Sequence, residues 1–367
     1  MSKVLVSFVH GYRDEEKLDI KKELIPGLLV ADTETLEVDD IYSFNFPRLP
    51  EDFYNNKIKD IFVGEFPKKD ESIHFKKLPR FGMMGLSVDE HSIYAATWNG
   101  IYCIDKKTFK EKSFISNRLI NDPHGIVVKD GILYSVLTSL DLVVLTDVAS
   151  GKVIDFFSIN RNLSITRDNS ILDFDWRFIT KQQRGAVGFW HFNNIRIEDN
   201  ILFLTSRLTS SILEVNLKTN EVNIRTVCWD TPVMIHDGEL DSDNNIVFTS
   251  VDGKILICNT AEKLTQGING ISNNHFHHLM KRDLVNVSIR IGNIRKKEVN
   301  WCRGIEDDGL NYITTTEGRY DQKQPYFNIT IISKKNNENI SDIPVLYSLV
   351  DFPEDIRYMT GFSIKNM

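Results

Sequence analysis

A short pattern recurs along the sequence, and this repeat constrains the fold more than any other feature. In each copy an apolar strand is followed by Asp or Asn, two further residues and usually a small or hydroxyl residue. The copies are GLLVADTET (27–35), GIYCIDKKT (100–108), LVVLTDVAS (142–150), SILEVNLKT (211–219), KILICNTAE (254–262) and a looser NITIISKKN (328–336). Asp and Asn suit the first corner of a β-turn because their side chains bond the backbone two residues on. Each copy therefore predicts a strand, a turn and the beginning of another strand.

A second pattern precedes the first. The strands IYAAT (93–97), ILYSV (132–136), ILFLT (201–205), IVFTS (246–250) and YITTT (312–316) each follow a polar tight turn. Turns such as Lys129-Asp130-Gly131 are typical of β-hairpins, and a further apolar strand precedes each of them. Each repeat therefore predicts four antiparallel strands, which is typical of a β-propeller blade.

The two ends of the chain predict how the ring closes. Residues 4–8 read as a second strand that lacks a first one, and residues 359–366 read as a first strand with nothing after it. Together they would make one blade, which predicts an all-β, six-bladed propeller closed by the C-terminal strand pairing with the N-terminal strands. Seven blades or a β-sandwich are the alternatives. We expect a single domain over residues 1–367, with insertions at about 40–80, 157–188 and 261–300.

The composition and net charge of the chain limit the kinds of partner that it is expected to bind. Lys and Arg total 44 against 51 Asp and Glu, so the net charge is -7, and a basic nucleic-acid footprint is not expected. No run of 18 apolar residues is present, and the N-terminus does not resemble a signal peptide. The four cysteines are scattered without a CxxC pair. We expect a cytoplasmic protein that acts on a small molecule and has no membrane or nucleic-acid partner.

Three of the nine histidines fall in one structural position. When the predicted inner strands are aligned on their hairpins, His124, His191 and His236 come from three consecutive blades and point to the channel at neighbouring depths. Three imidazoles with an open position are typical of a catalytic metal centre. The sequence therefore predicts a divalent metal ion on the axis, with Zn, Fe, Mn and Ca all possible.

Other residues near this position are candidates for catalysis and substrate binding. Arg303 would supply a fixed cation for an anionic group. By alternation Asp237 is expected to point away from the His236 face, and Glu239 is expected to do the same unless the strand bulges. The candidate catalytic residues are Arg303, Asn193, Glu239 and Asp122. The candidate substrate-binding residues are Trp190, Trp301, Arg303, Asn194 and Thr360. The segment His275-Phe276-His277-His278 is a weaker metal candidate, expected to be a solvated loop.

The blades resemble the six-bladed propellers of the broad NHL, SMP-30/gluconolactonase and strictosidine-synthase-like group. The resemblance rests on His124-Gly125-Ile126 followed by Ile132-Leu133-Tyr134, and on the repeated Ile-x-x-[Asp/Asn]-x-x-[Thr/Ser] turn. SMP-30-like enzymes surround a divalent cation with Glu, Asn and Asp, whereas histidines occupy the inner positions here. The resemblance therefore implies the fold and an axial metal, and it leaves the reaction open.

The functional prediction is a metal-dependent enzyme, of the hydrolase or of the lyase or isomerase type, acting on a small polar or anionic molecule at the propeller axis. One alternative is a non-catalytic binding module that presents the inserted segments to a protein or peptide. A further alternative is metal-free acid–base catalysis by histidine in the same channel.

Overall fold

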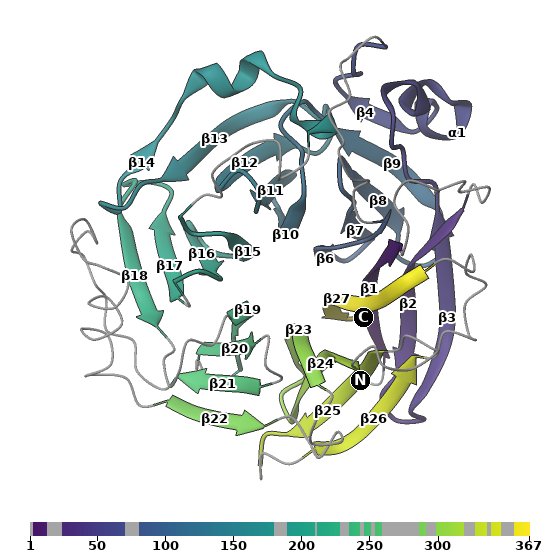
Figure 1. Cartoon of the computed structure of the whole chain (residues 1–367), viewed down its shortest axis with the longest axis vertical. Helices are drawn as coiled ribbons and strands as arrows, with labels where there is room; N and C mark the ends of the chain where they lie inside the picture. Colours follow the sequence, from purple (N-terminus) through teal and green to yellow (C-terminus); the bar gives the residue numbers. More distant parts are fainter. Residues whose placement is uncertain are drawn as a thin grey trace.

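The computed structural model shows an all-β chain whose sheets are arranged around a central axis, as Figure 1 shows. This confirms the predicted β-propeller class. The structure describes residues 3–12, 24–69, 81–179, 189–209, 211–227, 235–242, 246–250, 254–258, 286–290, 299–318, 327–335, 339–345 and 356–367. Within these residues no helix is both long enough and apolar enough to cross a membrane.

The described residues form six sheets, four of which are each built from an uninterrupted run of consecutive strands. One sheet joins the chain ends: β27 (Ile356–Asn366), β1 (Lys3–Tyr12), β2 (Ile25–Asp32) and β3 (Glu37–Phe44), with β5 (Phe81–Gly82) paired to β1. The next contains β6 (Leu86–Val88), β7 (Ser92–Ala96), β8 (Ile101–Asp105), β9 (Glu111–Ser116) and, outermost, β4 (Phe62–Gly64).

The other four sheets follow the chain in order from the axis outward. They are β10 (Pro123–Lys129), β11 (Ile132–Leu137), β12 (Leu142–Asp147), β13 (Val153–Ile159) and β14 (Ile165–Thr166); β15 (Phe192–Glu198), β16 (Ile201–Ser206), β17 (Ser211–Asn216) and β18 (Val222–Val227); β19 (Ile235–Leu240), β20 (Ile246–Ser250), β21 (Lys254–Cys258) and β22 (Asn286–Arg290); and β23 (Val299–Asp307), β24 (Asn311–Gly318), β25 (Phe327–Ser333) and β26 (Asn339–Val345). Helical turns are few: η1 (Pro50–Tyr54), α1 (Asn56–Lys59), η2 (Asn169–Asp173) and η3 (Trp176–Phe178).

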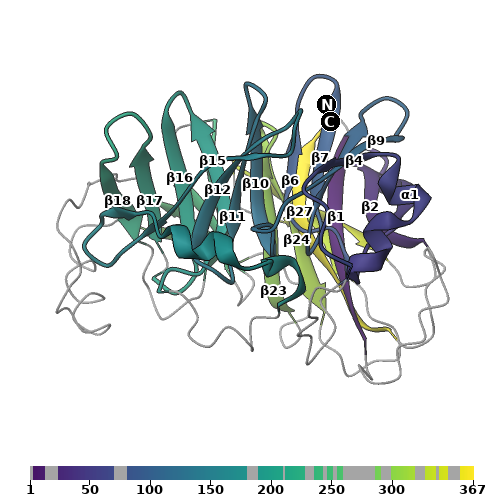
Figure 2. The ribbon, with the colours of Figure 1, turned by 90° about the horizontal axis from the view of Figure 1, so that it is seen from above.

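The two chain ends pair with each other. β27 runs antiparallel to β1, with Val6 opposite Ile364 and Val4 opposite Asn366, and β27 is the innermost strand of its sheet. Figures 1 and 2 both place the two termini close together. In the part of the chain that the structure describes, no strand pairing joins one sheet to the next. Neighbouring sheets are therefore held together by side-chain packing and by side-chain hydrogen bonds.

The predicted Asp/Asn turn is present in four sheets. Asp32 Oδ1 accepts hydrogen bonds from the backbone N–H groups of Glu34 and Thr35, at 2.8 and 3.0 Å. The N–H of the fifth residue then bonds to the carbonyl of the first, and that fifth residue has a positive φ. These fifth residues are Leu36 (62°), Phe109 (55°), Gly151 (68°) and Asn220 (57°). The turn thus reverses the chain between the third and the outer strand of each sheet.

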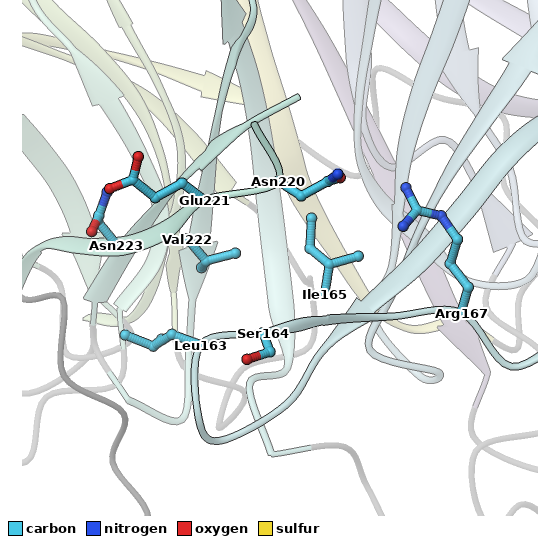
Figure 3. A pocket seen from close by; sticks show the side chains of 8 residues that line it. All are labelled: Leu163, Ser164, Ile165, Arg167, Asn220, Glu221, Val222 and Asn223. Atoms are coloured by element: carbon cyan, nitrogen blue, oxygen red, sulfur yellow. The ribbon is translucent and has the colours of Figure 1, made fainter. Parts of the chain in front are cut away.

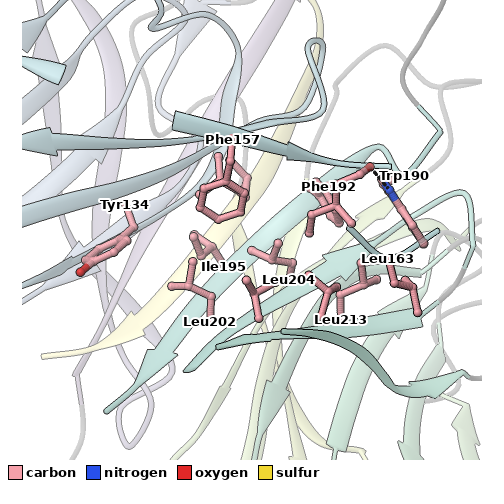
Figure 4. Close-up of a cluster of buried hydrophobic side chains, with 14 of the residues drawn as sticks. Tyr134, Phe157, Leu163, Trp190, Phe192, Ile195, Leu202, Leu204 and Leu213 are labelled. Carbon is pink, nitrogen blue, oxygen red and sulfur yellow. Dashed lines mark hydrogen bonds between the residues drawn. The ribbon is translucent and has the colours of Figure 1, made fainter. Parts of the chain in front are cut away.

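The core lies between the faces of adjacent sheets. Figure 4 shows one such cluster, in which Phe157 of one sheet packs with Leu204 and Leu213 of the next. Trp190 is part of the same cluster and is fully buried. Burial of large apolar side chains of this kind is the main source of stability in a ring of separate sheets.

The described parts of two predicted insertions pack against each other. The guanidinium of Arg177 is fully buried and donates to Asp175 Oδ1 at 2.8 Å and to the Glu65 carbonyl at 2.6 Å. Arg118 forms an ion pair with Glu65 and donates to the Leu172 carbonyl at 2.7 Å. These contacts fix η2 and η3 on the segment that carries β4. Most of the predicted insertion at 261–300 lies outside the described residues.

Candidate functional site

The inner strands carry β-bulges, and the bulged residues form the candidate site. The register with the neighbouring strand shifts in β10, β15, β19, β23 and β27. The residues skipped by these shifts include His124, Asn193, His236, Asp237, Gly304 and Phe362. A bulge breaks the strict alternation of a strand and re-aims the side chains next to it. Contacts among these residues show that they meet across neighbouring sheets.

His124 on β10 uses both of its ring nitrogens. Nδ1 lies 3.1 Å from Asn193 Oδ1 on the next sheet, and Nε2 lies 3.2 Å from Asp122 Oδ1. Asp122 also accepts a hydrogen bond from Ser139 Oγ at 2.6 Å. The amide Nδ2 of Asn193 is buried and has no hydrogen-bond partner among the described residues. Two predicted catalytic residues, Asp122 and Asn193, thus hold one of the predicted metal ligands.

His236 on β19 is held by the residue that follows it. Its Nδ1 lies 2.8 Å from Asp237 Oδ2, which also accepts the Gly304 N–H at 2.7 Å. Because a carboxylate only accepts, Nδ1 carries the proton and Nε2 keeps its lone pair. The structure records no hydrogen bond to Nε2 within the described ranges. Our prediction that Asp237 points away from His236 is wrong, because the bulge spans both residues and removes the alternation.

Burial sets the charge of this pair. It lowers the pKa of the His236 imidazole to about 4, against the raising effect of Asp237, and nearby Arg303 lowers it further. Burial alone would raise the pKa of Asp237, but His236, the Gly304 N–H and Arg303 together bring it below its ordinary value. At neutral pH, His236 is therefore neutral and Asp237 is ionised.

His191 joins the cluster from the residue just before β15. Its backbone has a positive φ of 52°, and the N–H groups of Trp190 and His191 donate to the two oxygens of Asp141, each at 2.6 Å. The ring centroid of His191 lies 6.3 Å from that of His124. Its Nε2 lies 3.4 Å from Nη1 of Arg207, so a guanidinium cation lies next to this nitrogen.

Phe362 and Arg303 complete the cluster. The ring of Phe362 on β27 lies edge-to-face with His124 and His236, at centroid distances of 5.0 and 5.4 Å. The guanidinium carbon of Arg303 on β23 lies 4.9 Å from the centre of the Phe362 ring, and Arg303 is 5% exposed. Sequence patterns did not single out Phe362, because an apolar residue on an inner strand is typical of core packing.

The described arrangement does not fit three imidazoles around one metal ion. A metal needs nitrogen lone pairs that converge at about 2 Å, but both nitrogens of His124 are engaged and a cation lies beside Nε2 of His191. The rings of His124 and His236 are 6.1 Å apart and only 21° from parallel. Among the described residues, no group of three or more His, Cys, Asp or Glu could hold a metal ion. The three predicted histidines do, however, belong to one cluster.

The remaining predicted residues divide into two groups. Asn194 Nδ2 donates to the Gly238 carbonyl at 3.0 Å and so braces β15 against β19. Trp190 does not face the channel: its indole donates to the Ile159 carbonyl at 2.7 Å inside the cluster of Figure 4. Glu239, Trp301 and Thr360 lie on β19, β23 and β27, but their side chains are outside the described part of the chain. The His275-Phe276-His277-His278 segment is outside it as well.

Comparisons with known proteins bear on the fold. No family model matches the sequence, and no curated protein is similar to it. A crystal structure of a nidogen/laminin complex is similar, with a TM-score of 0.52 and 9% identity, over 99% of this chain and 97% of that chain. This likeness supports the propeller architecture and no more than that.

Two further solved structures are more distant. A protein of unknown function from Bacteroides caccae has a TM-score of 0.49 and 9% identity over 100% of both chains. Hydrazine synthase from Kuenenia stuttgartiensis has a TM-score of 0.42 and 12% identity over 72% of this chain. The match spans 66% of that protein's chain, which is slightly less than two thirds. The resemblance to NHL and related propellers holds at the level of architecture, as the likeness to the nidogen/laminin structure supports.

Proposed function

We propose that the protein is an enzyme that uses histidine acid–base chemistry on a small polar or anionic molecule at the propeller axis. One observation carries the proposal: Asp237 fixes the Nδ1–H of a buried, neutral His236, so that Nε2 keeps a lone pair. An imidazole oriented by a carboxylate is a common general base, because the carboxylate sets the tautomer and stabilises the imidazolium that forms.

The electrostatics of the cluster favour an anionic ligand. An imidazole with a pKa of about 4 is a weak base until a negative charge approaches it. An anion bound beside His236 would raise the pKa of the imidazole towards neutrality, where proton transfer is most efficient. Arg303, held over the Phe362 ring, is the cation that would orient such a group. Elimination, isomerisation and hydrolysis all include a proton transfer of this kind.

We infer further that the six sheets form one six-bladed ring. Contacts between bulged residues join two pairs of neighbouring sheets, His124 with Asn193 and Asp237 with Gly304. Phe362 reaches His124 past the sheet of β6. These contacts support a ring in which β27, the strand from the chain end, lies at the axis between β23 and β6. The candidate site would then depend on both ends of the chain.

The test uses a defined mixture of small carboxylic acids, lactones and sugar phosphates, followed by proton NMR. His236→Asn keeps a donor for Asp237 and removes Nε2, so it should abolish any conversion shown by the parent. His10→Gln is the matched control, because His10 is also buried with a pKa of about 4 but lies on β1, outside the cluster. Conversion that persists in His236→Asn would contradict the proposal. Conversion that stops when EDTA is added would favour a metal centre instead.

A further inference from the structure

The amide of Asn193 carries a hydrogen-bond donor that the described part of the protein does not use. Asn193 lies on β15 and is fully buried, and its Oδ1 lies 3.1 Å from Nδ1 of His124 on the neighbouring sheet. Its Nδ2 has no hydrogen-bond partner among the described residues. Buried donors are almost always satisfied, because leaving one unpaired costs free energy. This end of the amide is therefore suited to an acceptor on a bound molecule.

His124 fixes which end of the amide is left over. Its Nε2 lies 3.2 Å from the carboxylate of Asp122, and its Nδ1 faces the amide oxygen of Asn193. Both of these partners are acceptors, so the ring donates from both nitrogens as an imidazolium. A cation at Oδ1 draws electron density from the amide and makes its N–H groups stronger donors. The unused donor is therefore suited to an oxygen that carries or gains negative charge.

The backbone around this donor is held in an uncommon conformation. Asp122, Asp141 and His191 have φ of 53°, 50° and 52°, in the left-handed region that non-glycine residues seldom adopt. The N–H of His191, two residues before Asn193, donates to Asp141 Oδ1 at 2.6 Å. Residues of this kind gather at ligand-binding and catalytic sites, where the surrounding structure fixes them. The donor is therefore preorganised, as stabilisation of a developing charge requires.

The donor lies close to the proposed base, His236. The two residues are on adjacent inner strands, β15 and β19, which Asn194 joins by donating from Nδ2 to the Gly238 carbonyl at 3.0 Å. The ring of His236 is centred 6.1 Å from the ring of His124, which contacts Asn193 directly. A small molecule bound at the axis would therefore lie between a base and a donor.

We propose that Nδ2 of Asn193 binds the carbonyl oxygen of the substrate and stabilises the negative charge that develops there. The inference rests on the acid–base function proposed above, and it narrows the substrate to a carbonyl compound with a hydrogen on the adjacent carbon. Nε2 of His236 takes that proton, the C–H electron pair forms a C=C bond, and the carbonyl π pair moves to the oxygen. The resulting enolate accepts a hydrogen bond from Nδ2, while Asp237 stabilises the imidazolium. Return of the proton to carbon restores a carbonyl.

Exchange of hydrogen for deuterium tests this step without the natural substrate. Pyruvate and dihydroxyacetone are the probes, each in deuterium oxide, and the readout is loss of the proton NMR signal next to the carbonyl. We expect the parent to exchange at least one probe faster than buffer does. Asn193→Asp keeps the shape of the side chain but removes the donor, so the exchange rate at saturating probe should fall about a hundredfold or more. KM should change much less, because the charge appears only in the transition state.

Two variants serve as controls. Asn99→Asp makes the same change at another buried amide, whose Nδ2 donates to the Pro47 carbonyl at 2.8 Å outside the cluster, and it should leave exchange unchanged. A cavity of about 480 Å³ at the outer strands β14 and β18, shown in Figure 3, is lined by Glu221, whose exposed carboxylate is a base of its own. Glu221→Gln should also leave exchange unchanged.

Exchange in Asn193→Asp at the parent's rate would overturn the inference, as would a parent that exchanges neither probe faster than buffer. If Asn193→Asp does not fold, the parent decides. Oxalate, a planar analogue of the enolate of pyruvate, should shift the Nδ2 resonances of Asn193 in ¹⁵N NMR, and unchanged resonances would contradict the donor role.

The same variants separate this inference from the proposed function. Conversion of another class of compound in the mixture described above, without exchange of either probe, would overturn the enolate step and leave the acid–base function standing. Exchange that is lost in Asn193→Asp but persists in His236→Asn would support the donor and contradict His236 as the base.

Discussion

At the residue scale, two buried histidines make the stability depend on pH. Burial lowers the pKa of both His10 and His236 to about 4, well below the value of about 6.5 in an unfolded chain. The unfolded state therefore binds more protons between these values. The stability that the neutral imidazoles provide is complete above pH 6.5 and is lost as the pH falls towards 4.

We predict that the free energy of unfolding falls by about 2 kcal/mol per histidine between pH 7 and pH 5. Urea titrations at the two pH values measure this change. This pH-dependent decrease in the free energy of unfolding should be about half as large in His10→Gln. It should be smaller still in the double variant that also carries His236→Asn. A free energy of unfolding that is the same at both pH values would show that the imidazoles are not buried in neutral form.

Leu36 tests the repeated turn. It adopts a φ of 62° at the position that Gly151 and Asn220 occupy in other sheets, and its side chain is 40% exposed. The left-handed region costs a residue such as leucine about 1–2 kcal/mol, and Asn tolerates it better. Leu36→Asn should therefore raise the free energy of unfolding by about 0.5–1 kcal/mol, measured in urea, whereas Leu36→Val should lower it. The reverse order would mean that the turn has another geometry.

At the element scale, hairpins and turns were predictable and bulges were not. The Asp/Asn turn and the Asp130-Gly131 hairpin follow from local side-chain and glycine chemistry, and both are present. The assumption that side chains alternate strictly along a strand correctly predicted that the three histidines lie in one cluster. The same assumption placed Asp237 on the wrong face of β19. A bulge depends on how neighbouring inner strands fit together around the axis, which no local pattern of residues encodes.

Gly125 tests the contact between inner strands. A Cβ at this position would lie 2.7 Å from the Cα of Asn194, so the backbones of β10 and β15 touch there. Gly125→Ala should lower the free energy of unfolding by about 2–3 kcal/mol, because neither backbone can move aside without breaking the cluster. Gly131→Asn is the control: φ is 74° and nothing lies within 4 Å of the added Cβ, so a change within about 0.5 kcal/mol is expected. Thermal and urea unfolding followed by circular dichroism distinguish the two outcomes.

At the scale of the whole molecule, one sheet is built from both ends of the chain. β27 pairs along β1, buries Ile364 and supplies Phe362 to the axial cluster. Deletion of residues 356–367 should therefore abolish cooperative unfolding of the whole chain, and not merely remove a local element. Differential scanning calorimetry of the truncated protein tests this, and a single transition at the parent's temperature would contradict it.

The architecture could be predicted because the strand and turn pattern of a propeller blade repeats along the sequence. The contacts that surround the histidines at the axis could not be predicted. Alignment of the predicted inner strands was enough to place His124, His191 and His236 near one another. They could not show that Asn193 and Asp122 engage both nitrogens of His124, or that Arg207 lies beside His191. These partners come from different sheets, and their distances depend on how the ring packs.

The most direct test of the account is the protonation state of His236. Side-chain ¹⁵N NMR of the labelled protein, assigned with His236→Asn and recorded from pH 7 to pH 4.5 with and without EDTA, reports both the tautomer and the pKa. We predict an Nδ1–H tautomer that stays neutral to about pH 5 and is unchanged by EDTA. Protonation near pH 6.5, an Nε2–H tautomer, or resonances that shift on chelation would contradict the proposed acid–base site.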